Sequence, residues 1–210
     1  MNKKLLIACV VSLVASAGQV QAATIGWTTS GGSANAGFNG TVGHSLIVNS
    51  TINVDSLGVF DHLGDGLESG SAVGLWSELG ALLASAEVPA GTGGTLIDRY
   101  RFTSITPITL SPGTYRLGAV LRDAAAYRVE SALVTTTPEV TIDLTEGWYD
   151  LNLNDLEFPN IPILSTTPGL IALDSANLTF TTVPEPTSAL FLCGTGALAC
   201  LRRRRRTQPA

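Results

Sequence analysis

The sequence predicts an all-β domain, built as a two-sheet β-sandwich or a jelly-roll-like fold. Runs rich in Val, Ile, Thr, Leu and Tyr recur about every ten residues, and Gly, Pro, Asn and Asp separate them. Between Ala23 and Thr182 no long stretch has the periodicity of an amphipathic helix, and residues 124–126 would form at most one turn. Many short strands with frequent turns are typical of two packed antiparallel sheets.

The strands are predicted from alternating apolar positions. The clearest is 114–121, which follows the turn Ser111-Pro112-Gly113, and Arg99-Tyr100-Arg101-Phe102 alternates charge with aromatic side chains. In such a strand the arginines should face water and the aromatic rings should face the core. Further alternating residues are Ile52 and Val54, Leu57 and Val59 (an early pair of strands), Ile108 and Leu110, Val140, Ile142 and Leu144, and finally Leu178 and Phe180.

The sequence predicts an N-terminal signal peptide, residues 1–22, before this domain. Asn2, Lys3 and Lys4 form a short basic region, and residues 5–17 are an apolar run of signal-peptide length. Small or modest residues at 20–22 predict export through the Sec translocon and cleavage by signal peptidase between Ala22 and Ala23. Residues 6–9 are similar to a lipoprotein box, but few residues precede Cys9 and the apolar run continues beyond it, so we assign Cys9 to the signal helix.

The C-terminal tail, residues 183–206, has three parts. Pro184-Glu185-Pro186 leads into residues 187–201, which carry no charge and predict a short transmembrane helix. The last part is a cluster of five arginines: Arg202, Arg203, Arg204, Arg205 and Arg206. Because arginines resist crossing lipid, this end should stay in the cytoplasm and everything before Pro184 should lie outside. Fifteen helical residues span only ~22 Å of a ~30 Å hydrocarbon core, which suits a temporary anchor.

This tail resembles the PEP-CTERM sorting signal of Gram-negative bacteria. In that family the Pro-Glu-Pro box is thought to be read by an exosortase, a membrane protease that removes the tail, and the substrates are typically surface or exopolysaccharide-associated proteins. The resemblance implies a precursor held transiently in the inner membrane and then a processed protein at the cell surface or outside the cell. The alternative is an ordinary transmembrane anchor that is never cut.

The composition of the exported part, residues 23–182, narrows the function further. All three cysteines, Cys9, Cys193 and Cys200, lie outside it, so it has no disulfide framework and no cysteine metal site. Between Ala23 and Thr182 the sequence contains five arginines and sixteen acidic residues, which gives a formal charge of −11. Such a surface repels nucleic acid, and it also repels anionic polysaccharide unless cations bridge the two.

One stretch of the domain is more specific than the rest. It runs as a strand ending at Asp61, an Asp/Gly loop, a strand with Trp76 and a hairpin. This order resembles a domain of unknown function found in many exported bacterial proteins with this tail, over roughly residues 38–121. The resemblance implies a β-sandwich and no particular activity.

No catalytic constellation is apparent in the sequence, so we predict a protein that is not an enzyme. The exported part has two histidines, His44 and His62, and lacks a Gly-x-Ser-x-Gly elbow, a His-Glu-x-x-His pair and a phosphate-binding glycine loop. We expect Trp76, Tyr100 and Phe102 in the core rather than in a sugar-binding platform. Trp148 and Tyr149, in the acidic, loop-like stretch 143–157, are better candidates for an exposed aromatic contact.

The loop 61–68 is the candidate binding site. Asp61, Asp65 and Glu68 fall within eight residues, and Gly64 and Gly66 permit a tight backbone. Carboxylate and backbone oxygens could hold calcium, and no other cofactor is expected, although the spacing is not that of an EF-hand. Alternatively, Asp65-Gly66 makes a hairpin turn and Asp61 caps its own backbone. A paired-carboxylate glycosidase site is a third interpretation.

These observations predict a non-catalytic exported protein that is processed at its C-terminal signal and associates with the cell surface or an extracellular polysaccharide matrix. The alternative is a carbohydrate-binding or carbohydrate-cleaving module. The expected partners are an exosortase-type protease, signal peptidase, the Sec translocon and exopolysaccharide.

Overall fold

The computed structural model describes residues 22–35, 38–122, 128–130, 132–152, 155–164 and 174–184. These residues form strands and loops and contain no helix, so the prediction of an all-β domain is confirmed. The strands are β1 (Thr24–Ile25), β2 (Trp27–Ser30), β3 (Ser33–Asn35), β4 (Gly40–Val48), β5 (Ile52–Phe60), β6 (Ser71–Ser77), β7 (Leu82–Val88), β8 (Thr95–Ile97), β9 (Tyr100–Leu110), β10 (Gly113–Leu121), β11 (Arg128–Glu130), β12 (Leu133–Thr136), β13 (Val140–Asp150), β14 (Ile161–Leu164) and β15 (Ala176–Thr182).

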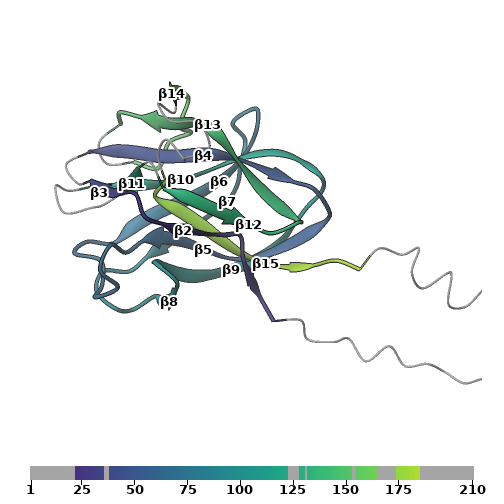
Figure 1. The fold of residues 1–210 in the computed structure, drawn as a ribbon, viewed down its shortest axis with the longest axis horizontal. Coiled ribbons are helices and arrows are strands. Elements are labelled where there is room, and N and C mark those ends of the chain that lie inside the picture. The colour runs from purple at the N-terminus through teal and green to yellow at the C-terminus, as the bar shows by residue number, and fades with distance from the viewer. Residues whose placement is uncertain are drawn as a thin grey trace, which may run out of the picture.

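Two large sheets make up most of the domain (Figure 1). One is five-stranded, in the order β1-β15-β5-β9-β8, and the other is six-stranded, in the order β14-β13-β4-β10-β6-β7. Two small two-stranded sheets, β11-β3 and β12-β2, complete the described strands. Strands that follow each other in sequence often belong to different sheets, so the chain crosses between the sheets repeatedly.

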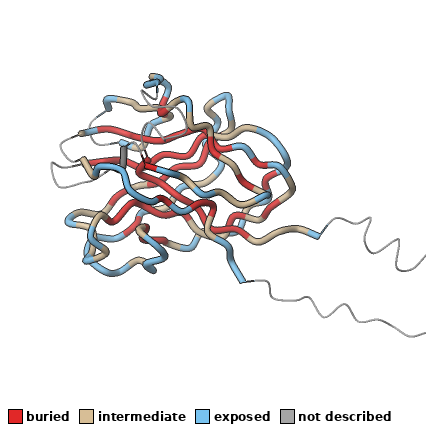
Figure 2. The backbone as a smooth tube through the Cα atoms, viewed as in Figure 1, coloured by how far each residue is buried: buried red, intermediate tan, exposed pale blue. Residues whose placement is uncertain are grey.

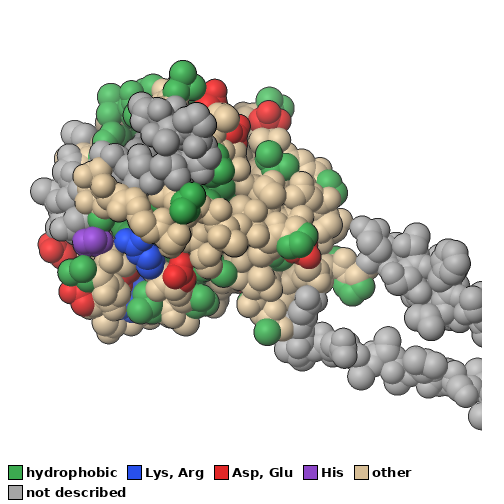
Figure 3. Space-filling view, in the orientation of Figure 1, with side chains coloured by type: hydrophobic (Ala, Val, Ile, Leu, Met, Phe, Trp, Pro, Cys, Tyr) green, Lys and Arg blue, Asp and Glu red, His purple; other side chains and the backbone are tan. Residues whose placement is uncertain are grey.

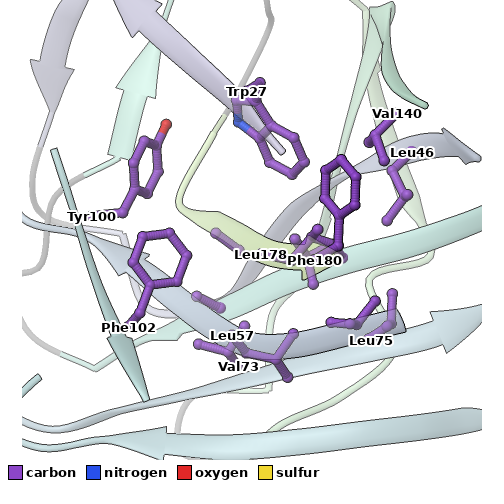
Figure 4. Close-up of a cluster of buried hydrophobic side chains, with 14 of the residues drawn as sticks. Trp27, Leu46, Leu57, Val73, Leu75, Tyr100, Phe102, Val140, Leu178 and Phe180 are labelled. Carbon is purple, nitrogen blue, oxygen red and sulfur yellow. The ribbon is translucent and has the colours of Figure 1, made fainter. Parts of the chain in front are cut away.

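The core lies between the two large sheets. Leu57, Phe102 and Phe180 from the five-stranded sheet meet Leu46 and Leu75 from the six-stranded sheet, as the close-up in Figure 4 shows. Figure 2 shows that buried residues follow the strands of the two large sheets and that exposed residues gather in the connecting loops. Burying each large apolar side chain contributes roughly 1.5–3 kcal/mol, so this shared core is the main source of stability.

Three local predictions need correction. Residues 52–60 form one strand, β5, with an irregularity between Val54 and Ser56, rather than an early pair of strands. Strand β13 extends through Asp150, so half of the stretch predicted as loop-like is strand. Arg101 of β9 is buried and does not face water, because its guanidinium bonds to a buried carboxylate described below. Residues 124–126 lie outside the described part.

Both ends of the domain lie at one pole. Thr24 of β1 is the partner of Phe180 in β15, and Thr182 of β15 is the partner of Ile52 at the start of β5. Strand β5 then runs to Phe60, roughly 26 Å away at 3.3 Å per residue. Loop 61–70 therefore lies at the opposite pole, next to β8, which Figure 1 places far from the two ends. We call the first the terminal pole and the second the distal pole.

Candidate functional site

The terminal pole carries the junction between the domain and the tail. The backbone N–H of Val183 donates to the carbonyl of Thr51 at 3.2 Å, and this hydrogen bond continues the pairing of β15 with β5 just beyond the two strands. Pro184 follows at once and is exposed, and Ala22 and Ala23 at the other end are exposed as well. The Pro-Glu-Pro box thus begins directly where the folded domain ends.

Most of the predicted targeting segments cannot be compared with the structure. Residues 1–21, Glu185, Pro186, residues 187–201 and the arginine cluster Arg202, Arg203, Arg204, Arg205 and Arg206 lie outside the described residues. Within the part that is described, no helix has the length and apolar character needed to cross a bilayer.

At the distal pole, Asp61 organises loop 61–70. Its Oδ1 accepts the N–H of Gly64 at 3.0 Å and its Oδ2 accepts the N–H of Gly66 at 3.1 Å. Both glycines have positive φ, 73° and 122°, which L residues adopt with difficulty. The predicted capping of the backbone by Asp61 is therefore present. The predicted hairpin is not, because the loop connects β5 to β6 in the other sheet.

Arg101 is the buried partner of Asp61. Its Nε donates to Oδ2 of Asp61 at 2.6 Å, its second amino group donates to the carbonyl of Gly64 at 2.9 Å, and its first donates to that of Gly94 at 3.2 Å. The arginine thus fixes the loop through both its acid and its backbone. This role of Arg101 was not predicted from the sequence, although the small number of positive charges in so acidic a domain was a signal.

A cavity of about 320 Å³ opens beside this loop. Asp61, His62, Asp65 and Glu68 line it from the loop, and Arg122 lines it from the end of β10. One amino group of Arg122 donates both to the carbonyl of Gly70 at 2.9 Å and to Oε1 of Glu87 at 2.7 Å. Figure 3 shows side chains of both charges at this end of the domain. The distal pole therefore offers a hollow with mixed charge.

The three acids predicted to hold calcium play different parts. Asp61 is buried and both its oxygens accept protein hydrogen bonds, whereas Asp65 and Glu68 are exposed. In the described residues no group of three or more His, Cys, Asp or Glu is arranged to hold a metal ion. A calcium ion here would therefore need its six to eight oxygens from Asp65, Glu68, backbone carbonyls and water.

A second polar cluster lies inside the core, on Asp174. Its Oδ2 accepts hydrogen bonds from Trp27 Nε1 at 3.0 Å and from the hydroxyl of Tyr100 at 2.5 Å, and its Oδ1 lies 3.6 Å from Nδ1 of His44. Burial raises the pKa of Asp174 to about 6, although these two donors act against the rise. Burial, assisted by the charge of Arg116, lowers the pKa of His44 to about 3. All members of this cluster are buried, and it brings Tyr100 of the five-stranded sheet and His44 of the six-stranded sheet close to the same carboxylate.

The predictions of which aromatic side chains are buried and which are exposed are confirmed only in part. Trp76, Tyr100 and Phe102 are buried, as predicted. Trp148 is half-buried, because the guanidinium of Arg116 lies 3.5 Å from the centre of its ring and 5.0 Å from that of Phe158. Tyr149 is also half-buried and meets Phe38 edge-on. Neither ring is an open sugar platform.

Comparison with known proteins concerns the tail alone. Residues 182–206 match a family model described as the PEP-CTERM protein-sorting motif, so the chain carries this motif. The match begins at Thr182, the last residue of β15. No curated protein and no solved structure matches the chain. The motif implies an exported protein that is sorted at its C-terminus and is generally associated with processing by an exosortase.

Proposed function

We propose that this chain is a non-catalytic protein that is exported, released from its tail by an exosortase-type protease, and retained at the cell surface or in an extracellular polysaccharide matrix. The observation that carries the proposal is the coincidence of the motif with the domain boundary: the matched segment starts at the last residue of β15. Cutting within this matched segment, beyond Thr182, leaves the fifteen strands of the described residues intact.

The position of the two ends supports the same proposal. Because the N- and C-terminal ends share the terminal pole, a domain tethered there presents its distal pole away from the membrane. The facing five- and six-stranded sheets fit a β-sandwich of the jelly-roll kind, a compact carrier for such a surface. Signal peptidase would act at the exposed Ala22 and Ala23, beside β1.

Fractionation tests the location. Cells producing the full chain are separated into cytoplasm, inner membrane, outer surface, extracellular polymer and medium, and an antibody to the domain locates it. We expect the shortened domain in the surface or polymer fraction and the precursor in the inner membrane. Full-length protein confined to the inner membrane would instead support a permanent anchor.

A carbohydrate-binding or carbohydrate-cleaving module is the second candidate, and the distal cavity favours it. Asp65, Glu68 and Arg122 line a hollow of about 320 Å³, large enough for one sugar residue, and the two acids are exposed. Pull-down of the purified protein with polysaccharides tests binding, and reducing-end release tests cleavage. A signal that is lost in Asp65→Asn and Glu68→Gln would establish this function.

A further inference from the structure

The outer edge of β7 has no strand partner in the described part of the chain. Strand β7 pairs with β6 and with no other described strand, and it ends the six-stranded sheet. Alternate residues of an edge strand direct backbone N–H and C=O groups away from the sheet, where another chain can pair with them. The strand contains no proline and no lysine, residues that natural edges often use to prevent such pairing.

A groove of about 410 Å³ runs between this edge and β9 of the opposite sheet. Strand β8 pairs with β9 only at Tyr100, Arg101 and Phe102, so the later part of β9 is free of β8 and borders the groove. The groove is lined by Leu83, Ala84, Ser85, Ala86, Glu87, Thr103, Ser104, Ile105, Thr106 and Ile108. Small, apolar and hydroxyl side chains therefore dominate the surface.

The charge of this surface is compatible with a second copy of the chain as its occupant. The exported part has a formal charge of −11, which repels a second copy from most directions. In the groove lining the single charged residue is Glu87, and Arg122 of the same chain already pairs with it at 2.7 Å. A second copy can approach here without placing unpaired carboxylates against each other.

The register of β7 permits pairing with itself. A β-bulge opposite Trp76 interrupts the strand near Leu83, so the regular part runs through residues 84–88. An antiparallel pair centred on Ala86 places Ala84 opposite Val88 and Ser85 opposite Glu87. The Ser85 hydroxyl can then donate to the partner's carboxylate, and no two acids face each other.

We propose that a second copy of this chain docks at this edge, by antiparallel pairing of the two β7 strands about a twofold axis at Ala86. The pairing joins the two six-stranded sheets into one continuous sheet. It leaves the terminal pole free, and it does not depend on the proposed location of the protein.

Charge variants at Ser85 test the register by sedimentation equilibrium of the full-length chain in detergent. Ser85→Glu places two acids opposite each other and should weaken the dimer about tenfold, whereas Ser85→Lys should keep it or strengthen it through Glu87 of the partner. All variants share the tail, so association through the tail is common to them. A wild-type chain that stays monomeric, or equal effects of Glu and Lys, would overturn the proposal.

Cysteine crosslinking provides a second readout. In a chain with Cys9→Ala, Cys193→Ala and Cys200→Ala, an added Ala86→Cys lies opposite its own copy at a Cα distance of about 4.5–5.5 Å, suitable for a disulfide. Thr95→Cys on the edge strand β8 is the matched control. We expect rapid disulfide dimers from Ala86→Cys and slow ones from Thr95→Cys, and equal rates would contradict the proposed axis.

Discussion

Nε of Arg101 donates a hydrogen bond of 2.6 Å to Oδ2 of Asp61, and both side chains are buried. This pair joins β9 to loop 61–70 and thereby shapes the distal cavity. Removing one member of a buried ion pair leaves the other charge buried without a partner. The resulting loss of stability is larger than the net stabilisation that the intact pair provides.

Asp61→Asn should therefore lower the free energy of unfolding by about 3 kcal/mol. Urea unfolding followed by tryptophan fluorescence measures the change. Asp65→Asn is the matched control, because Asp65 is exposed in the same loop and should change stability by no more than about 0.5 kcal/mol. If the two variants were equally stable, the pair would not organise the loop.

Calcium should leave the unfolding midpoint unchanged. The oxygens of Asp61 are used by Gly64, Gly66 and Arg101, and two exposed acids supply too few ligands for a tight site. The measurement is thermal unfolding in millimolar calcium and in chelator. Calcium bound to the native state at a hundred times its Kd would raise the free energy of unfolding by ~2.7 kcal/mol. An increase of this kind that disappears in the double variant Asp65→Asn/Glu68→Gln would establish the calcium site.

The buried His44 and Asp174 should give opposite dependences on pH. The folded-state pKa of Asp174, about 6, lies above its ordinary 3.8, so its stabilising contribution is full below pH 3.8 and is lost as pH rises through 6. The folded-state pKa of His44, about 3, lies below its ordinary 6.5, so its contribution is full above pH 6.5 and is lost as pH falls through 3.

Replacing the imidazole should remove only the second dependence. As the pH falls from 7 to 4, the wild type should lose free energy of unfolding that His44→Gln keeps. The difference in free energy of unfolding between the two proteins should therefore change by on the order of 3 kcal/mol in favour of His44→Gln, whatever its value at pH 7. Urea unfolding of both proteins at a series of pH values measures this difference. A difference that stays constant across the series would mean that His44 does not titrate as the buried geometry requires.

The fold class could be predicted from the sequence because period-two alternation and turn residues report directly on strands. The strand predicted from residues 178 and 180 is present as β15, although Asn177 and Thr179 on its other face are buried as well. Strand β10 has both faces buried, because Arg116 lies on its outer side under Trp148 and Phe158. In β10 the alternation of polar and apolar residues therefore does not indicate which face of the strand is exposed to solvent.

The distal site could be predicted only as a loop with acids. Sequence spacing identified Asp61 and the glycines, because an Asp that caps its own loop is a local interaction. Arg101 is forty residues away from Asp61, and Arg122 and Glu87 are thirty-five apart. Such contacts depend on which strands end at the same pole, and strand order is not encoded in local pattern.

The Pro-Glu-Pro box should be needed for release. Proline fixes φ and removes backbone donors, so Glu185 between two prolines should be extended and accessible to a protease. Glu185→Ala should leave a precursor retained in the membrane, detected by immunoblot of membrane and soluble fractions. Glu185→Asp is the conservative control, and normal release of Glu185→Ala would mean that the box is only a linker.

The most direct test of the account is intact-mass spectrometry of the mature protein recovered from outside the cell. Processing at both ends predicts an N-terminus at Ala23 and a C-terminus within a few residues of Pro184, with a tag placed after Ala210 lost. A secreted or surface form that still carries residues 187–201 and the arginines Arg202–Arg206 would contradict it.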